Sequence, residues 1–210
     1  MEHEEALQRL RQLEGSDLVA LAAELGVTVW KGNRKNRGWA GHVLEHYLGL
    51  PLNSARSPNF GSWELKVVSL KHGRDGRIVV KETMQITMID AWHVARTPFE
   101  ESHLLSKLRK AIVCGRLWHG ADEHRSELVR VESFDLMQDS QLLEEIRQDY
   151  ELVRQAINER GFEALTGRMG RWVQPRTKGP GHGSTSRAFY ARTCLVRRIL
   201  HLDRLTASDK

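Results

Sequence analysis

Glu64 and Lys66 are the residues of this 210-residue chain whose types and spacing best fit a chemical role. They lie in a β-like segment, and side chains two residues apart in a strand project from the same face. A carboxylate and an ammonium held side by side at a strand end can bind a divalent cation and direct a water molecule at a phosphate. The pair therefore indicates phosphodiester hydrolysis, although a Glu-x-Lys triplet is also common on solvated strands.

The segment before this pair supplies a further candidate ligand. Asn59 is expected on the turn that enters the strand. Its side-chain oxygen, the Glu64 carboxylate and the backbone carbonyl of Leu65 are donors of the kind that Mg²⁺ or Mn²⁺ prefers. Lys66 is then expected to hydrogen-bond the attacking water and the phosphate, and so to offset the charge that develops there.

The elements that must position these residues are a mixture of helices and strands. Apolar periodicity and turn signals predict helices over 3–14, 18–25, 39–48, 102–110, 139–160 and 188–202, and strands over 63–70, 78–89, 111–118, 128–131 and 171–175. The stretches 31–38 and 177–186 are polar and glycine-bearing and are predicted to be loops. Helices that flank a small mixed sheet define the class α/β (α+β).

Composition limits the partners and the location. A net charge of +5 and a pI near 9.4 allow a polyanionic partner without proving one. No apolar run approaches the roughly 18 residues that span a bilayer, and the acidic N-terminal segment is unlike a targeting signal, so no membrane partner is expected. Cys114 and Cys194 lack a Cys-x-x-Cys spacing, which favours structural thiols in a reducing bacterial cytoplasm.

Five collinear segments resemble the MutH family, which joins the methyl-directed mismatch repair endonuclease to related type II restriction enzymes within the PD-(D/E)xK nuclease fold. They are residues 36–49 (the helix before the catalytic motif), 58–66 (Pro-Asn-Phe, then Glu-Leu-Lys), 102–110 (a basic helix with an additional lysine), 174–178 (an Arg-x-Lys segment) and 187–190 (Arg-Ala-Phe-Tyr). The resemblance implies one domain, 1–210, with two arms that grip DNA. We expect a catalytic lobe to about residue 125 and a recognition lobe over 126–210.

The same resemblance implies individual roles. Glu45 becomes an accessory acid near the metals and Lys107 a second cation that contacts the phosphate or orients the water, beside Asn59, Glu64 and Lys66. The residues expected to bind DNA are Lys35, Arg37, Arg176, Lys178, Arg187 and Tyr190. Alternatives stay open: an exposed helix residue at Glu45, a generic basic face around Lys107, a core position for Tyr190, and a phosphate-binding stripe at Arg176 and Lys178.

Position 59 departs from the family, which has Asp there. Asn offers a neutral oxygen, so metal affinity should fall. Three explanations remain: an engineered inactive form, a natural variant that relies on Glu45 and Glu64, or a DNA-binding protein that does not cleave.

The expected function is a sequence-specific, Mg²⁺-dependent double-stranded DNA endonuclease of the restriction or repair type. The expected partners are duplex DNA and, for the repair type, other repair proteins, with a monomer or weak dimer as the oligomeric state. The rival interpretations are a catalytically silent DNA-binding protein and a structural protein whose Glu-x-Lys triplet lies on the surface without a chemical role.

Overall fold

Three sheets form the framework of the described part of the chain. The structure, a computed structural model, describes residues 1–49, 62–178 and 185–202. A four-stranded sheet has the order β4 (Ile78–Val80), β3 (Glu64–His72), β6 (Lys110–Leu117) and β7 (Leu128–Asp135), and a three-stranded sheet has the order β5 (Met84–Met88), β9 (Arg187–Ala191) and β8 (Val173–Thr177). A small hairpin pairs β1 (Trp30–Lys31) with β2 (Arg34–Lys35). The pairing of β3 with β6 is parallel and all the others are antiparallel.

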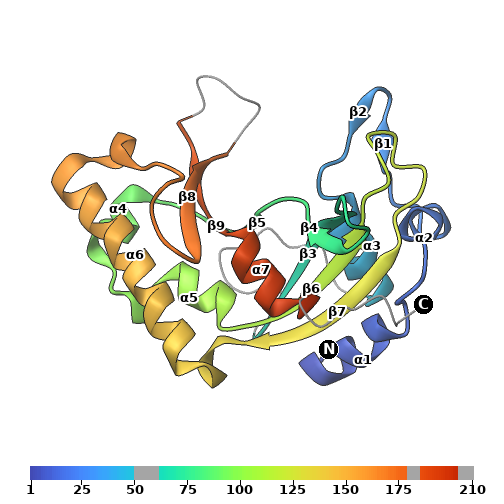
Figure 1. Cartoon of the computed structure of the whole chain (residues 1–210), viewed down its shortest axis with the longest axis horizontal. Helices are drawn as coiled ribbons and strands as arrows, with labels where there is room; N and C mark the ends of the chain where they lie inside the picture. Colours follow the sequence, from blue (N-terminus) through green and yellow to red (C-terminus); the bar gives the residue numbers. More distant parts are fainter. Residues whose placement is uncertain (50–61, 179–184, 203–210) are drawn as a thin grey trace.

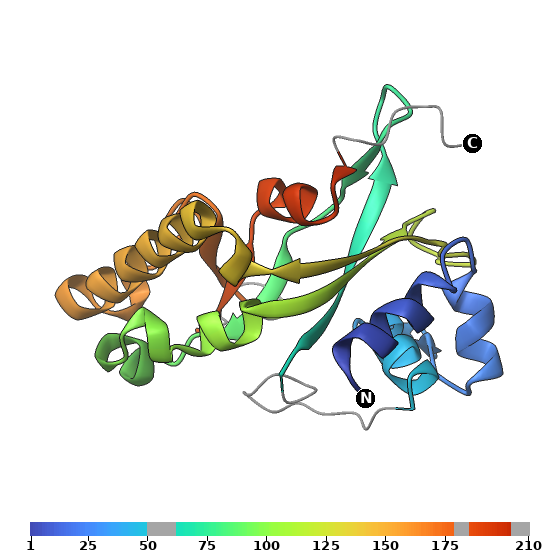
Figure 2. The same cartoon turned by 90° about the horizontal axis from the view of Figure 1, so that it is seen from below.

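Helices lie on both sides of the four-stranded sheet (Figures 1 and 2). One group contains α1 (His3–Arg11), α2 (Leu18–Glu24) and α3 (Trp39–Tyr47); the other contains α4 (Ala91–Arg96), α5 (His103–Leu108), α6 (Ser140–Arg160) and α7 (Thr193–Ile199). Short 3-10 turns cover Phe99–Glu101, Leu136–Gln138 and Phe162–Ala164. The mixed sheet with flanking helices confirms the predicted α+β class.

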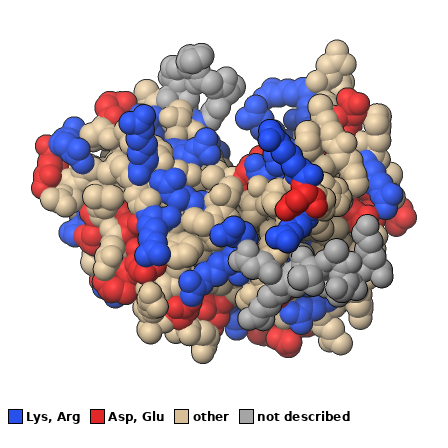
Figure 3. Space-filling model, viewed as in Figure 1, with Lys and Arg blue, Asp and Glu red and all other residues tan. Residues whose placement is uncertain are grey.

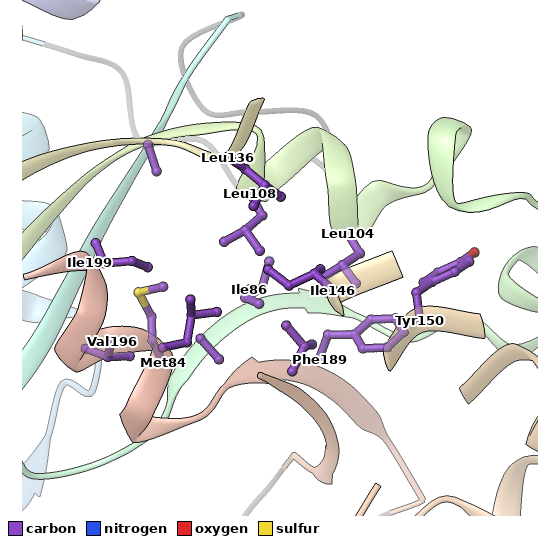
Figure 4. Packing of buried hydrophobic residues seen from close by; sticks show 14 of the residues in the cluster. Met84, Ile86, Leu104, Leu108, Leu136, Ile146, Tyr150, Phe189, Val196 and Ile199 are labelled. Atoms are coloured by element: carbon purple, nitrogen blue, oxygen red, sulfur yellow. The ribbon is translucent and has the colours of Figure 1, made fainter. Parts of the chain in front are cut away.

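The alternation of side chains along β3 and β6 divides the apolar interior into two cores. Leu65 and Ile112 pack against α1, α2 and α3. Val68, Leu70 and Val113 face the opposite way, into a core shared with the three-stranded sheet and with α4 to α7 (Figure 4). Because both faces are covered, the two central strands are held by apolar burial from each side.

Most of the predicted long elements are confirmed, with shorter bounds for the helices and shifted or longer bounds for the strands. The helix α6 begins where the Asp139 carboxylate accepts the Leu142 N–H at 3.0 Å, and it ends at Gly161, whose φ is +82°. Its buried stripe includes Ile146, Tyr150 and Val153, at the helical spacing visible in the sequence.

Three element predictions are wrong. The segment 78–89 is not one strand but β4 and β5, which belong to different sheets. The polar stretch 31–38 contains the second strand of a hairpin, and residues 187–191 form β9, so the last helix starts only at Thr193. In each case the strand is short or polar, and the sheet partner that fixes it is not visible in the local pattern.

The predicted lobe boundary near residue 125 stays a prediction. Both larger sheets cross it: β7 completes the four-stranded sheet from beyond residue 125, and β5 enters the three-stranded sheet from before it. No helix in the described part of the chain is long and apolar enough to span a membrane. Both cysteines are free thiols, with Cys114 buried and Cys194 half-buried.

Candidate functional site

Glu64 is the first residue of β3, and its side chain is almost fully buried, with 1% exposed. Its partner in the strand register is Ala111 at the start of β6. The Nζ of Lys66 donates to Glu64 Oε1 at 2.6 Å. The carboxylate and ammonium of the Glu-x-Lys triplet thus lie on one strand face, as the two-residue period requires.

Lys107 brings a second ammonium to the same carboxylate from α5. Its Nζ lies 3.3 Å from Glu64 Oε1 and 3.2 Å from Oε2. Ser102 caps this helix by accepting the Leu105 N–H, and Lys107 lies in the last turn. The structure therefore brings Lys107 to the Glu-x-Lys pair.

Burial lowers the pKa of Lys107 below its usual value, since the charged form loses solvation. The negative charge of Glu64 opposes this shift, and the positive charge of Lys66 adds to it. The negative charge of Glu45 also raises the Lys107 pKa. Glu45 is itself buried on α3, with 8% exposed, so it is not an exposed helix residue.

The predicted metal ligands are described only in part. Asn59 lies outside the described residues, as does the turn expected to carry it. Within the described ranges, no three or more His, Cys, Asp or Glu side chains gather as a metal centre. The donors that are described, the Glu45 and Glu64 carboxylates, are of the hard oxygen type that suits Mg²⁺. In this structure, the ammonium groups of Lys66 and Lys107 donate hydrogen bonds to the Glu64 oxygens.

The predicted recognition residues lie on and beside the β8–β9 hairpin. The Arg176 side chain donates to Thr83 Oγ1 at 3.0 Å, and its guanidinium lies 5.9 Å from the Tyr190 ring centroid. Arg187 bonds Thr177 and pairs with Glu163 at 3.3 Å, so its guanidinium is already engaged within the protein.

Two further residues complete this hairpin face. Tyr190 is half-buried, and burial raises its pKa. Lys178 is exposed at the end of β8, where its backbone N–H bonds the Ser186 carbonyl. The structure brings Arg176 and Tyr190 together but keeps both on a sheet separate from that of Glu64.

The β1–β2 hairpin carries the remaining two candidates. Arg37 is exposed just beyond β2. Lys35 instead directs its Nζ to the buried carboxylate of Glu123, at 2.7 Å. Sequence reasoning did not nominate Glu123, because a glutamate in the polar stretch 119–127 has no local signal that distinguishes it from a solvated surface residue.

The two hairpins project on the same side of the molecule, as Figure 1 shows. The surface between them is hollowed, and Lys and Arg side chains gather on both sides of this groove (Figure 3). A groove with basic walls and basic projections attracts a polyanion.

A strand-end Glu-x-Lys pair whose carboxylate is shared with a buried second lysine is an arrangement typical of the class of deoxyribonucleases. The family model described as "DNA mismatch repair enzyme MutH" matches residues 48–149, which contain Glu64, Lys66 and Lys107. Over these residues the chain is similar to the MutH family.

Curated relatives extend the match beyond that region. The "DNA mismatch repair protein MutH" of Vibrio parahaemolyticus is 26% identical, over 93% of this chain and 92% of that protein. The protein of the same name from Vibrio cholerae is 30% identical over 52% of this chain and 48% of that protein. Among solved structures, one described as "Restriction endonuclease MvaI-cognate DNA substrate complex" has a TM-score of 0.37 and 12% identity, over 87% of this chain and 95% of that one. The TM-score of that superposition is low, and the similarity to MutH rests on the sequence matches.

Proposed function

We propose that this chain is a Mg²⁺-dependent, sequence-specific endonuclease that hydrolyses phosphodiester bonds of double-stranded DNA. The observation that carries the proposal is the buried Glu64 carboxylate at the start of β3, which receives the ammonium groups of Lys66 and Lys107. The MutH relatives support DNA as the substrate class.

Glu64, the carbonyl of Leu65 and residue 59 would hold the metal, with Glu45 as an accessory acid. Bound Mg²⁺ would supply Lewis-acid stabilisation of the phosphorane and help to activate water. Lys66 is the more exposed of the two lysines, with 20% of its side chain exposed against 7% for Lys107, so we assign Lys66 to the phosphate. Lys107, whose pKa burial lowers, loses a proton more readily than a solvated lysine, and we assign it to orient the attacking water.

A second candidate function is favoured by Asn59, which replaces the family's acid. Such a chain would bind duplex DNA without cleaving it. Glu45, Glu64, Lys66 and Lys107 all persist, and a decayed enzyme would tend to lose several of these, so the nuclease is the better-supported function.

For partners, we propose duplex DNA in the groove between the two hairpins. Arg176, Lys178, Arg187 and Tyr190 would read or contact it from one side and Arg37 from the other. The names of the curated relatives support repair proteins as further partners, and their bacterial sources support a cytoplasmic location. A monomer or weak dimer stays our expectation.

The test compares four proteins on supercoiled plasmid with Mg²⁺: the chain as given, Asn59→Asp, Asn59→Asp with Glu64→Gln, and Asn59→Asp with Glu4→Gln. We expect Asn59→Asp to cut faster than the chain as given, because a carboxylate restores a charged metal ligand. Glu64→Gln should then reduce cutting at least about 100-fold, because the metal and its stabilisation of charge are both weakened.

Glu4→Gln makes the same chemical change at an exposed position of α1 and should leave the rate unchanged. Nicks would indicate a repair-type enzyme and double-strand breaks a restriction type. If neither the chain as given nor Asn59→Asp cuts while both bind DNA, the silent DNA-binding protein is correct and the nuclease proposal is wrong.

A further inference from the structure

Glu123 is a buried acid that the proposed catalytic chemistry does not use. Glu123 lies in the connection between β6 and β7, and the residue is 3% exposed. Its φ is +44°, in the left-handed region that disfavours a glutamate. A strained backbone that holds a buried carboxylate persists only when surrounding contacts compensate both costs, which makes this position a candidate for function.

Three donors from separate elements meet this carboxylate. Lys35 Nζ of the β1–β2 hairpin lies 2.7 Å from Oε1, Arg116 Nη1 of β6 lies 2.9 Å from the same oxygen, and Trp39 Nε1 of α3 donates to Oε2 at 2.7 Å. The Arg116 guanidinium also lies 5.1 Å from the Trp39 ring centroid. Burial alone would raise the pKa of Glu123, but the bonds from these donors outweigh it and hold the pKa below its usual value.

The segment that carries Glu123 is itself fixed to the sheet. Ser126 Oγ accepts from Arg116 Nη1 at 2.8 Å and donates to the Leu117 carbonyl at 3.1 Å, and its N–H donates to Asp17 Oδ1 at 2.8 Å. Glu123 is therefore a fixed point to which the hairpin is attached, rather than a mobile group that follows it.

The β1–β2 hairpin, by contrast, has little support of its own. It contains two residue pairs, Trp30 with Lys35 and Lys31 with Arg34. Lys31, Arg34 and Arg37 are exposed, and among the described residues none of them forms an ion pair. The bond between Lys35 and Glu123 is the one ion pair that joins this hairpin to the rest of the described chain.

We infer that Glu123 is a positioning residue for DNA binding: with Arg116 and Trp39 it holds the β1–β2 hairpin at a fixed angle, so that Arg34 and Arg37 face a phosphate backbone in the groove. This assigns Lys35 to the anchor rather than to DNA, and it rests on the proposed function. In Figure 1 the β6–β7 connection runs directly beside the hairpin, at its base. The benefit is preorganisation, because a hairpin already fixed in place loses less conformational freedom when DNA binds.

The variants for the test are Glu123→Gln, which keeps the size of the side chain and removes its charge, and Glu123→Asn. Asn tolerates a positive φ and is too short to reach the three donors, so it provides a second route if the first variant fails to fold. The control is Asp122→Asn. Asp122 is the preceding residue in the chain, its side chain is 81% exposed, and the change raises the net charge by the same amount.

The first measurement is trypsin cleavage within the hairpin, which offers Lys31, Arg34, Lys35 and Arg37 as sites. We expect the Glu123 variants to be cut there several-fold faster than wild type at temperatures well below unfolding, while the Asp122→Asn control is cut at the wild-type rate. A merely global decrease in stability would instead accelerate cleavage along the whole chain.

The second measurement is affinity for a DNA duplex, without metal, as a function of salt. We expect the Glu123 variants to bind roughly tenfold more weakly, with a salt slope lower by about one for each phosphate that the displaced hairpin no longer reaches. Asp122→Asn should bind as well as wild type or slightly better. Arg37→Ala should cost less affinity in the Glu123→Gln background than in wild type, because the hairpin is already displaced there.

The inference is overturned if wild type binds duplex DNA and the Glu123 variants match Asp122→Asn in affinity, salt slope and hairpin cleavage. The proposed function would survive that result. If wild type itself shows no salt-dependent affinity for duplex DNA, the proposed function fails and this inference fails with it.

Discussion

At Lys107, a buried ammonium shares one carboxylate with a second lysine. Glu64 is 1% exposed and Lys107 is 6% exposed, so each depends on the other for charge compensation. The net contribution of this ion pair to the free energy of folding is reduced, since the cost of removing both charges from water offsets much of their attraction. An arrangement with a high desolvation cost on a central strand is typical of a site that selection maintains for chemistry.

Glu123 gives a prediction about pH that does not depend on DNA. Its pKa in the folded protein lies below the ordinary value of 4.5, so between these two values the unfolded chain binds more protons. The stabilisation from its ionised form is therefore complete above about pH 4.5 and disappears as the pH falls through the lowered pKa. Glu123→Gln lacks this titration. We expect the variant to be roughly 2 kcal/mol less stable at pH 7, with the difference narrowing below pH 4.5.

Thermal unfolding of both proteins from about pH 3 to about pH 7 measures this difference. Asp122→Asn again serves as the control, because its exposed carboxylate should give a pH profile parallel to wild type. A constant gap between wild type and Glu123→Gln across the whole range would contradict the assignment.

The sequence was sufficient to nominate Glu64 and Lys66, to which a strand period and a family pattern both point, and Lys107, to which the family pattern alone points. The sequence did not indicate the role of Lys35. This lysine lies in a basic segment that was expected to be exposed, but its ion-pair partner is Glu123, a buried acid far along the chain. Such a pairing depends on how the β6–β7 connection approaches the β1–β2 hairpin, which no local pattern encodes.

At the scale of elements, the base of the β8–β9 hairpin is held by the buried carboxylate of Asp149. Its oxygens accept the N–H groups of Arg171, Trp172 and Val173, at 2.6, 2.7 and 2.8 Å. The turn before β8 therefore has a defined shape, which includes Gly170 with a φ of +76°.

Gly170→Ala tests that turn. An added Cβ would lie 1.9 Å from the Val173 carbonyl oxygen at a φ that already disfavours alanine, so the backbone must shift. We expect a decrease of about 3 kcal/mol or more in the free energy of unfolding, measured by urea denaturation. Gly167→Ala is the matched control, since its Cβ would meet ordinary neighbours at 3.6 Å or more; a comparable decrease in both variants would contradict the argument.

The predicted elements also differ in whether their own residues were enough to identify them. Long amphipathic or fully buried segments such as α6 and β6 were recognisable from their own residues. The short strands β1, β2 and β9 were not, because a few residues of mixed polarity become strands only through a partner strand. The misassigned segment 78–89 shows the limit clearly: continuous β propensity concealed a change of sheet between Val80 and Met84.

At the scale of the whole molecule, two projections with basic residues face one groove (Figure 3). If each contacts a phosphate, then Arg37→Ala and Arg176→Ala should each lower the salt slope of duplex binding by about one, and the double variant by about two. Fluorescence anisotropy titrations at several salt concentrations measure these slopes. Arg11→Ala, on α1 at the opposite end from the hairpins, should leave the slope unchanged. A double variant no different from either single one would exclude a two-sided grip.

The parallel pairing of β3 with β6 also has a kinetic consequence. Glu64 and Lys107 meet only after the chain has closed the segment between these strands, and that segment includes β5, which belongs to the other sheet. Closing such a loop delays the contacts it brings together. During synthesis on the ribosome, the two charged partners would therefore come into register late, after at least half of the chain has emerged. A partly folded molecule would therefore lack the assembled Glu64–Lys107 pair on which the proposed cleavage of DNA depends.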